Sequence, residues 1–497
     1  MSTDTSPSIT EGSGSALSVE RNGINVIDES ERKGRPAELF WPWCAANISV
    51  LGLSYAAFVL YFGLSFWQAA VASVIGTVLS FLLVGFVSLA GKRGSSPTMA
   101  LSRAAFGVRG NVLPAVASYL ILVGWETALV ALSTLATATI FSQLGWSSGN
   151  LTKIIAFLIV AGLIVIAGVL GFDLIMRMQR WLTIATVIIT LAYIGLTFHQ
   201  IDFTAVKAMP GGSITAGIGA LVLMMTAFGL SWVNSAADYS RYLPRAASSR
   251  GVVAWTTFGG AIAPVILLLY GLLLIGSHNN LIDAIGSDPL GTLATLLPNY
   301  FLLIYAIVVV AGLVAGAVLD IYSSGLTLLT LGLPWPRWAA ALLDGVFMII
   351  GGIYIVWVAQ NFLGPFQGFL ITLGVPITSW CGVFLADLAL RRKDYDEAAL
   401  FDASGRYGAV NPVPIMLILI SMVVGWGLVT NLSPGFGWQG YLLGVFGLGG
   451  KSGTWAGANL GVAFAFVFSF VGYAVLCARR VRAQESVPSS RSATLVS

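Results

Sequence analysis

The chain has 497 residues, of which 57% are hydrophobic and only 9% are charged, and its net charge is +4. Its mean hydropathy of +0.88 lies far outside the usual balance of a soluble globular protein. The composition therefore excludes that class and predicts a polytopic membrane protein. The three cysteines are far apart in the sequence and suggest neither a disulfide framework nor a metal site.

In chain order, the apolar residues gather into twelve segments. A helix needs about 20 apolar residues to cross the hydrocarbon core of a bilayer. The segments are long and rich in Leu, Ala, Gly and Val, without the period-two pattern of transmembrane strands, so we expect helices. They are centred near residues 52, 78, 125, 162, 190, 228, 264, 316, 348, 377, 421 and 467.

Polar segments flank this predicted membrane domain at both ends. Residues 1–36 are predicted to be a cytoplasmic, largely disordered tail, since their first part is of low complexity. Residues 37–482 form the predicted transmembrane domain, and residues 483–497 a cytoplasmic C-terminal tail. We expect no cleaved signal peptide, because no short apolar core lies near Met1.

The basic residues predict the orientation of the twelve spans. With the N-terminus in the cytoplasm, 22 of the 25 Lys and Arg residues fall in inner segments, and only Lys153, Lys207 and Lys451 fall in outer ones. This bias follows the positive-inside rule. We therefore expect a multi-pass protein of the cell membrane with both termini in the cytoplasm.

The first and sixth spans each contain a Gly-Leu-Ser step, at Gly52–Ser54 and Gly229–Ser231. Paired interrupted helices at corresponding positions of two five-helix halves indicate an inverted-repeat secondary transporter with its site near the bilayer midplane. The alternative is that these small residues only allow close helix packing.

Two ionisable residues, Glu126 and Asp320, lie inside predicted spans and away from their ends. Asp320 has no basic residue within a helical turn, so we expect its carboxyl to be protonated at least part of the time. Such a group could carry a coupling proton or bond a polar substrate. The alternative is a neutral carboxyl satisfied by a neighbouring helix. Four other acids are expected near cytoplasmic span ends: Asp173, Asp238, Asp344 and Asp387.

Aromatic residues accompany these polar positions. Trp125 precedes Glu126, and Phe228 and Trp232 flank the break in the sixth span. An aromatic surface beside a carboxyl suits a flat heterocycle that stacks on the ring and offers its N–H and C=O edge. The alternative for each ring is ordinary packing.

Several segments together resemble the nucleobase–cation symporter family 1, and within it the purine–cytosine permease branch. The resemblance runs in order from about Val19 to Arg480, and it rests on "VERNGINVIDESERKGRPAELFWPWCAANISV", "GKRGSSPTMALSRAAFGVRGNVLP", "GLSWVNSAADYSRYLPR", "LADLALRRKDYD" and "YGAVNP". It implies inverted repeats over about 37–200 and 212–392, extra helices over about 411–480, and substrate between spans one, three, six and eight.

The resemblance also implies roles for individual residues. Trp125 falls on the stacking tryptophan of span three and Ser49 on a polar substrate contact in span one. Asp320 falls where relatives carry a substrate-binding asparagine. Leu129 falls where many relatives carry a polar amide.

One position of the sixth span departs from the hydantoin-type relatives. Gly229 falls on their second stacking tryptophan. By this mapping, Phe228 or Trp232 would have to supply that face of the substrate site.

A further departure concerns the coupling ion. The positions of sodium contacts in related proteins map to Ala45, Ile48, Val314 and Ala315. The last two side chains offer no oxygen ligand. Proton coupling is therefore favoured over sodium coupling, with Asp320 as first candidate carrier and Glu126 as second. An alternative register would place Ser323 and Ser324 at the hydroxyl positions.

These inferences predict a permease that imports nucleobases, cytosine and/or purines such as adenine and hypoxanthine, by proton symport. An outer gate is expected in span ten near Phe362 to Phe366. The predicted partners are the substrate and the lipid bilayer, with no nucleic acid, obligate protein partner or cofactor. The sequence contains no Walker motif, Cys-x-x-Cys or histidine cluster in the spans, so we expect no enzyme.

Other transport functions remain open at this point. They are a permease for allantoin, hydantoin, uracil, pyridoxine or thiamine coupled to either ion, and a non-transporting sensor of the same fold. A channel is disfavoured, because the chain lacks a filter repeat and has the paired breaks of a carrier.

Overall fold

The computed structural model describes residues 23–170, 172–278, 280–333, 335–359, 361–431 and 433–487. These residues form α-helices, short 3-10 helices and turns, and they contain no strand. The prediction of an all-helical fold is therefore confirmed for the described part of the chain.

Within the described residues, ten helical segments are long and apolar enough to cross a membrane. They are α3 (Phe66–Gly94), α5 (Val112–Gln143), α6 (Asn150–Leu170), α7 (Phe172–Thr197), the segment from α9 to α11 (Ile214–Ser240), α12 (Ser249–Gly276), α15 (Asn299–Thr330), α16 (Arg337–Trp357), α17 (Leu363–Leu390) and α19 (Leu460–Ser486). A bent pair, α1 (Phe40–Asn47) and α2 (Leu51–Leu60), brings the number to eleven if it counts as one span.

The remaining predicted span corresponds to α18 (Pro412–Gly427). This helix has 16 residues, which is short of the roughly 20 that a full span needs. Each of the twelve predicted segments thus contains a helix, and ten or eleven of them reach the length of a span.

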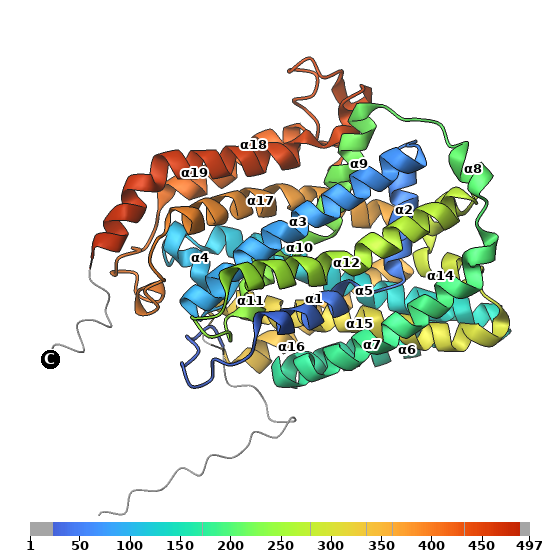
Figure 1. Cartoon of the computed structure of the whole chain (residues 1–497), viewed down its shortest axis with the longest axis horizontal. Coiled ribbons are helices and arrows are strands. Elements are labelled where there is room, and N and C mark those ends of the chain that lie inside the picture. Colours follow the sequence, from blue (N-terminus) through green and yellow to red (C-terminus); the bar gives the residue numbers. More distant parts are fainter. Residues whose placement is uncertain are drawn as a thin grey trace, which may run out of the picture.

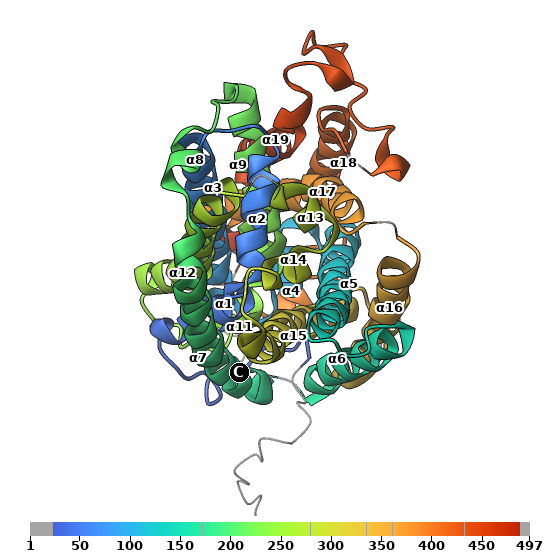
Figure 2. The ribbon, with the colours of Figure 1, turned by 90° about the vertical axis from the view of Figure 1, so that its right-hand side faces the viewer.

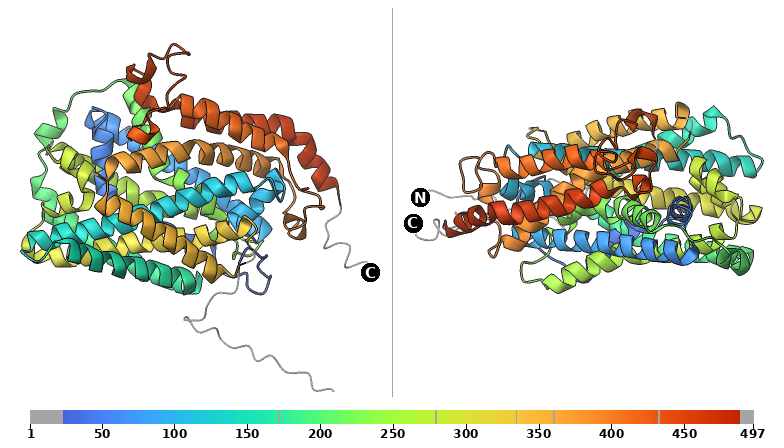
Figure 3. Two further views of the ribbon diagram at one scale, coloured as in Figure 1. Left: turned by 180° about the vertical axis from the view of Figure 1, so that it is seen from behind. Right: turned by 90° about the horizontal axis from the view of Figure 1, so that it is seen from above.

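The long helices lie side by side and run between the two ends of the molecule (Figure 1). α19 packs on α17 and α18, and these three form one flank, which the view from behind also shows (Figure 3). α6, α7 and α16 lie toward the opposite flank, and α1, α2 and α5 lie between the flanks (Figure 2). All residues of α15 from Gly312 to Thr330 are buried, so Asp320 lies in the interior.

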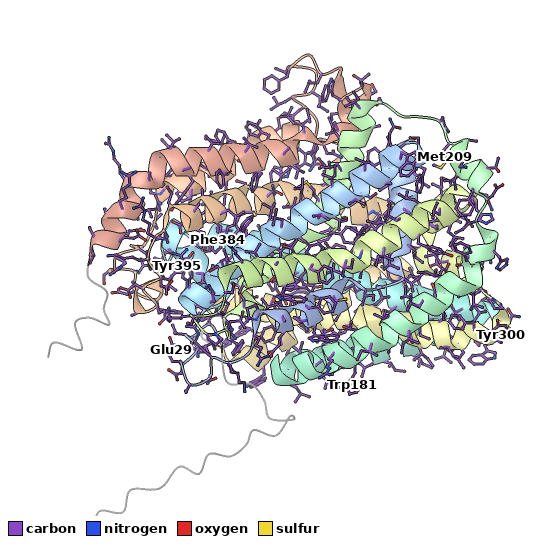
Figure 4. The ribbon with its side chains drawn as sticks, in the orientation of Figure 1. Glu29, Trp181, Met209, Tyr300, Phe384 and Tyr395 are labelled. Atoms are coloured by element: carbon purple, nitrogen blue, oxygen red, sulfur yellow. The ribbon has the colours of Figure 1, made fainter. Side chains whose placement is uncertain are left out.

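At one end of the bundle, where α3 ends and α12 begins, arginines pair with acidic residues, and we call this the basic end. Arg245 forms ion pairs with Glu29, Glu397 and Asp394. Figure 4 shows Glu29 and Tyr395 toward this end, and Met209 and Tyr300 toward the other. A connected set of ion pairs at the end of the bundle fixes these loops more firmly than one exposed pair would.

Residues 23–35 belong to the segment 1–36 that is expected to be a tail, and they pack on the basic end. Arg32 is only 6% exposed, and its Nε donates to the Leu243 carbonyl at 2.9 Å. The Ile27 side chain is buried, and the backbone N–H of Ile27 donates to the carbonyl of Ser95 at 2.9 Å. This segment packs on the basic end because its guanidinium and apolar side chains find partners there. Residues 1–22 lie outside the described part.

Candidate functional site

The first span is broken between α1 and α2, which meet at an angle of 65°. No backbone N–H of the described residues donates to the carbonyls of Ala45, Ala46 or Asn47 at this break. Lipid could not satisfy such groups, so they must face protein or a cavity. The break lies at 48–50, a few residues before the predicted step at Gly52, which is inside α2.

The second break interrupts the sixth span. α9 (Ile214–Ala227) ends at Phe228, whose φ of −114° and ψ of −109° are not helical, and α10 (Gly229–Trp232) follows. The chain then continues through a 3-10 turn into α11 (Ala236–Ser240). The predicted pairing of breaks in the first and sixth spans is therefore confirmed.

A cavity of about 50 Å³ lies where the two breaks, α5 and α15 approach one another. This is several times the space that one water needs. Fifteen residues line it: Ala46, Asn47, Ser49, Leu51, Gly52, Tyr55, Trp125, Leu129, Ala227, Phe228, Trp232, Gly312, Leu313, Gly316 and Asp320. A larger groove of about 710 Å³, lined mainly by apolar residues, lies on the outer surface between α3 and α12, where lipid chains would lie.

Several polar groups of the cavity are available to form hydrogen bonds with a ligand. Both carboxyl oxygens of Asp320 and the Nε1 of Trp125 are buried and have no hydrogen-bond partner among the described residues. Ser49 accepts from the Leu51 N–H at 3.3 Å, which leaves its own hydroxyl hydrogen available. An indole face beside a carboxyl and a hydroxyl can hold a flat molecule that has N–H and C=O groups on its edge.

An aromatic layer closes the cavity on the side away from the basic end. The rings of Tyr55 and Phe228 lie 4.9 Å apart, and Phe366 of α17 meets Trp125 edge-on at 5.2 Å between centroids. Phe362 stacks on Phe366 at 5.0 Å. Beyond this layer lies an outer vestibule of about 360 Å³, whose lining includes Phe58 and Phe366.

A second aromatic layer closes the cavity toward the basic end. Trp43 of α1 meets Trp232 edge-on at 5.7 Å and Tyr239 at 5.4 Å. The hydroxyl of Tyr239 donates to the carbonyl of Leu319 at 2.9 Å, which ties α11 to α15. The cavity therefore lies between two aromatic layers.

Gly229, which is expected to contact substrate, is not among the residues that line the cavity. Its N–H donates to the Ser80 Oγ at 3.1 Å. A Cβ added to it would lie 2.2 Å from the carbonyl carbon of Ser80. The glycine therefore allows α10 to approach α3, whereas Phe228 and Trp232 face the cavity as expected.

The four positions expected at a vestigial sodium site lie on α15 and at the break in the first span. Val314 and Ala315 have aliphatic side chains, and the Ala315 carbonyl accepts a hydrogen bond from Gln179 Nε2 at 2.7 Å. Ala45 and Ile48 lie at the break. Among the described residues, no three His, Cys, Asp or Glu side chains are placed to hold a metal ion.

The hydroxyls of the alternative register, Ser323 and Ser324, bond elsewhere. Ser323 Oγ lies 3.2 Å from the hydroxyl of Tyr239, and Ser324 Oγ lies 2.8 Å from Glu126 Oε1. Neither contact belongs to the break in the first span.

Two acids expected near span ends have different surroundings. Asp344 is fully buried and contacts Ser324, because α16 places this residue against the middle of α15. Asp238 is 2% exposed and accepts from the N–H and the hydroxyl of Thr98, both at 2.7 Å. Arg241 also interacts electrostatically with this carboxyl. The side chain of Asp173 lies outside the described part.

Sequence reasoning missed two polar or aromatic cavity residues, Tyr55 and Asn47. Tyr55 follows the Gly52–Ser54 step and points toward Phe228. Asn47 donates to the Trp43 carbonyl at 2.8 Å and ends α1. Their positions beside the predicted interruption are the signal that could have identified them.

Residues 26–449 match the profile of a family described as permeases for cytosine/purines, uracil, thiamine and allantoin. The Bacillus subtilis protein YxlA, which carries the name of a purine-cytosine permease, is 26% identical over 82% of this chain and 88% of its own length. The purine-cytosine permease FCY2 of Saccharomyces cerevisiae is 21% identical over 53% of this chain and 48% of its own.

Solved structures share the fold. A closed conformation of Mhp1, a nucleobase-cation-symport-1 family transporter with bromovinylhydantoin bound, aligns with a TM-score of 0.67 and 17% identity over 95% of this chain and 97% of its own. A Na+-coupled sialic acid symporter aligns with a TM-score of 0.60 and 12% identity over 91% of both chains.

Proposed function

The chain belongs to the family of permeases for cytosine/purines, uracil, thiamine and allantoin, and on that premise we propose that it imports nucleobases by proton symport. The family is one of permeases, so the chain is an integral membrane transporter and not an enzyme. The proposed substrates are cytosine and purines such as adenine and hypoxanthine, in keeping with the names of its relatives.

The observation that carries this proposal is that Trp125 and Asp320 line the same cavity. A nucleobase stacks on the indole face of Trp125, with Phe228 and Trp232 on the other lining walls. Its N–H and C=O edge bonds the Asp320 carboxyl, and Ser49 supplies a further hydroxyl. The Asp320 carboxyl is buried, so a base that bonds it spares the cost of leaving it unpaired.

The two aromatic layers act as gates in this mechanism. Opening the layer that contains Phe366, with Phe362 behind it, admits substrate and proton from the vestibule. Opening the layer of Trp43, Trp232 and Tyr239 releases them at the basic end, which we place in the cytoplasm. The two breaks are the points at which the half-helices can move relative to one another.

The charges at the cavity support the proposal of proton coupling. Asp320 has no ion-pair partner within the described residues, and the expected sodium positions offer aliphatic side chains. A hard cation requires oxygen ligands, whereas a buried carboxyl can be neutralised by one proton. Asp320 is the proposed carrier and Glu126 the second candidate.

The substrate class is tested by direct binding to the purified full-length protein. We expect saturable binding of labelled cytosine, adenine or hypoxanthine that unlabelled nucleobases displace. Uracil, allantoin, hydantoin, thiamine and pyridoxine serve as competitors in the same assay. Displacement by one of these five, together with no binding of cytosine or purines, would assign the cavity to that compound instead.

A further inference from the structure

Three helices, α5, α15 and α16, place two carboxyl groups in contact with one hydroxyl group. Ser324 Oγ of α15 lies 2.8 Å from Glu126 Oε1 of α5 and also contacts Asp344 Oδ2 of α16. Both acids and the serine are fully buried. No lysine, arginine or histidine of the described residues forms an ion pair with either acid.

The hydroxyl of Ser324 has one hydrogen, so it can donate to only one of the two carboxyl groups. Its contact with the other carboxyl is favourable only if that carboxyl carries a proton and donates to the serine oxygen. Two ionised carboxylates in a dry interior would also repel each other without a compensating cation. The arrangement therefore requires at least one bound proton.

A separate observation connects this group to the cavity. Asp320 is 1% exposed, lines the cavity, and has no hydrogen-bond partner at either oxygen. It lies four residues before Ser324, on the same face of α15. It is also close enough to interact electrostatically with Glu126 and Asp344.

The other titratable groups around these acids are tyrosines. Tyr119 of α5 lies beside Asp344, and Tyr239 of α11 lies near Asp320. Both are neutral donors or acceptors and supply no positive charge. Among the described side chains, none that is basic pairs with either acid, so protons can balance their charge.

We propose that Glu126, Ser324 and Asp344 form a second proton-binding site beside Asp320. In the internal step, the protonated carboxyl gives its hydrogen to Ser324 Oγ while the serine hydrogen passes to the other carboxylate. One O–H bond breaks and one forms at the serine, and the charge of the pair does not change. A role of this site in import rests on the proposed function, whereas the presence of a proton at the site does not depend on it.

Infrared spectroscopy of the purified full-length protein tests the site without any substrate. In the Asp320→Asn background, we expect a C=O band of protonated carboxyl that shifts in heavy water. Adding Glu126→Gln and Asp344→Asn should remove that band. An amide N–H can donate where the protonated acid donated, so the fold is expected to survive. An unchanged spectrum would overturn the proposal.

Ser324→Ala provides a second variant that leaves every carboxyl in place. It should shift the carboxyl band, because one hydrogen-bond partner is lost. Ser323→Ala is the matched control, since the neighbouring Ser323 bonds Tyr239 and touches neither acid. If the two variants gave the same spectrum as the unmodified protein, Ser324 would not bridge a protonated pair.

Discussion

Asp320→Asn is expected to bind substrate and to exchange it across the membrane, but not to accumulate it. The amide can still bond the edge of a base, whereas it cannot carry a proton through the transport cycle. One proton moving inward gains about 2.3 kcal/mol per 100 mV, which supports roughly a 40-fold concentration ratio. In vesicles with a membrane potential of about 100 mV, the Asp320→Asn variant should bring the inside and outside substrate concentrations to a ratio of about one.

The measurement is uptake of labelled cytosine, adenine or hypoxanthine in parallel with equilibrium binding. Asp402→Asn is a suitable control, because Asp402 is an exposed loop residue far from the spans. Equal accumulation by Asp320→Asn and by the unmodified protein would remove Asp320 as the proton carrier. Glu126 would then become the first candidate.

Trp125→Ala is expected to weaken binding by roughly five- to 150-fold. Stacking of a base on an aromatic side chain is worth about 1–3 kcal/mol per base when the ring is truncated to alanine. The indole of Trp125 is 9% exposed, and it contacts the cavity on one side and Phe366 on the other. Trp125→Phe keeps an aromatic face, so its affinity for the base should fall less than that of Trp125→Ala.

Equilibrium binding of a labelled nucleobase measures this change directly. Trp146→Ala serves as the control, because Trp146 is half exposed at the far end of α5 and lies outside the cavity. If Trp125→Ala bound the base as tightly as the control does, the substrate would not stack on this ring.

Most of the architecture could be predicted from hydropathy, because each span must hide its backbone polar groups in an apolar helix. The breaks were found from small and polar residues inside two spans. The predicted positions of the breaks were less accurate. Gly52 lies inside α2 and allows that helix to pack on Leu267, because an added Cβ would lie 2.9 Å from the Leu267 side chain. Likewise, Gly229 serves the contact of α10 with α3.

Part of the candidate site was predictable from chemistry alone. Four of the predicted residues line the cavity: Asp320, Trp125, Phe228 and Trp232. An ionisable residue at membrane depth is costly and therefore usually marks a functional site, and the aromatic residues lie near it. Phe366, the proposed gate residue, lies against Trp125. The two residues are 241 positions apart in the sequence, so no local pattern reveals this contact.

Asp344 shows why the rest could not be predicted. It lies two turns inside α16, and its sequence position suggests a span end with water nearby. Which face of α16 meets α15 depends on the crossing of two helices and not on the hydropathy of either. The structure places this acid on Ser324, where it becomes part of the proposed second proton site.

The central claim is that a proton gradient drives nucleobase import, and gradient-driven uptake into vesicles containing the purified protein tests it most directly. Uptake of the bound nucleobase should rise above equilibrium with an inward proton gradient in sodium-free medium, and it should stop when that gradient is collapsed. Uptake that requires sodium and persists without the proton gradient would contradict the claim.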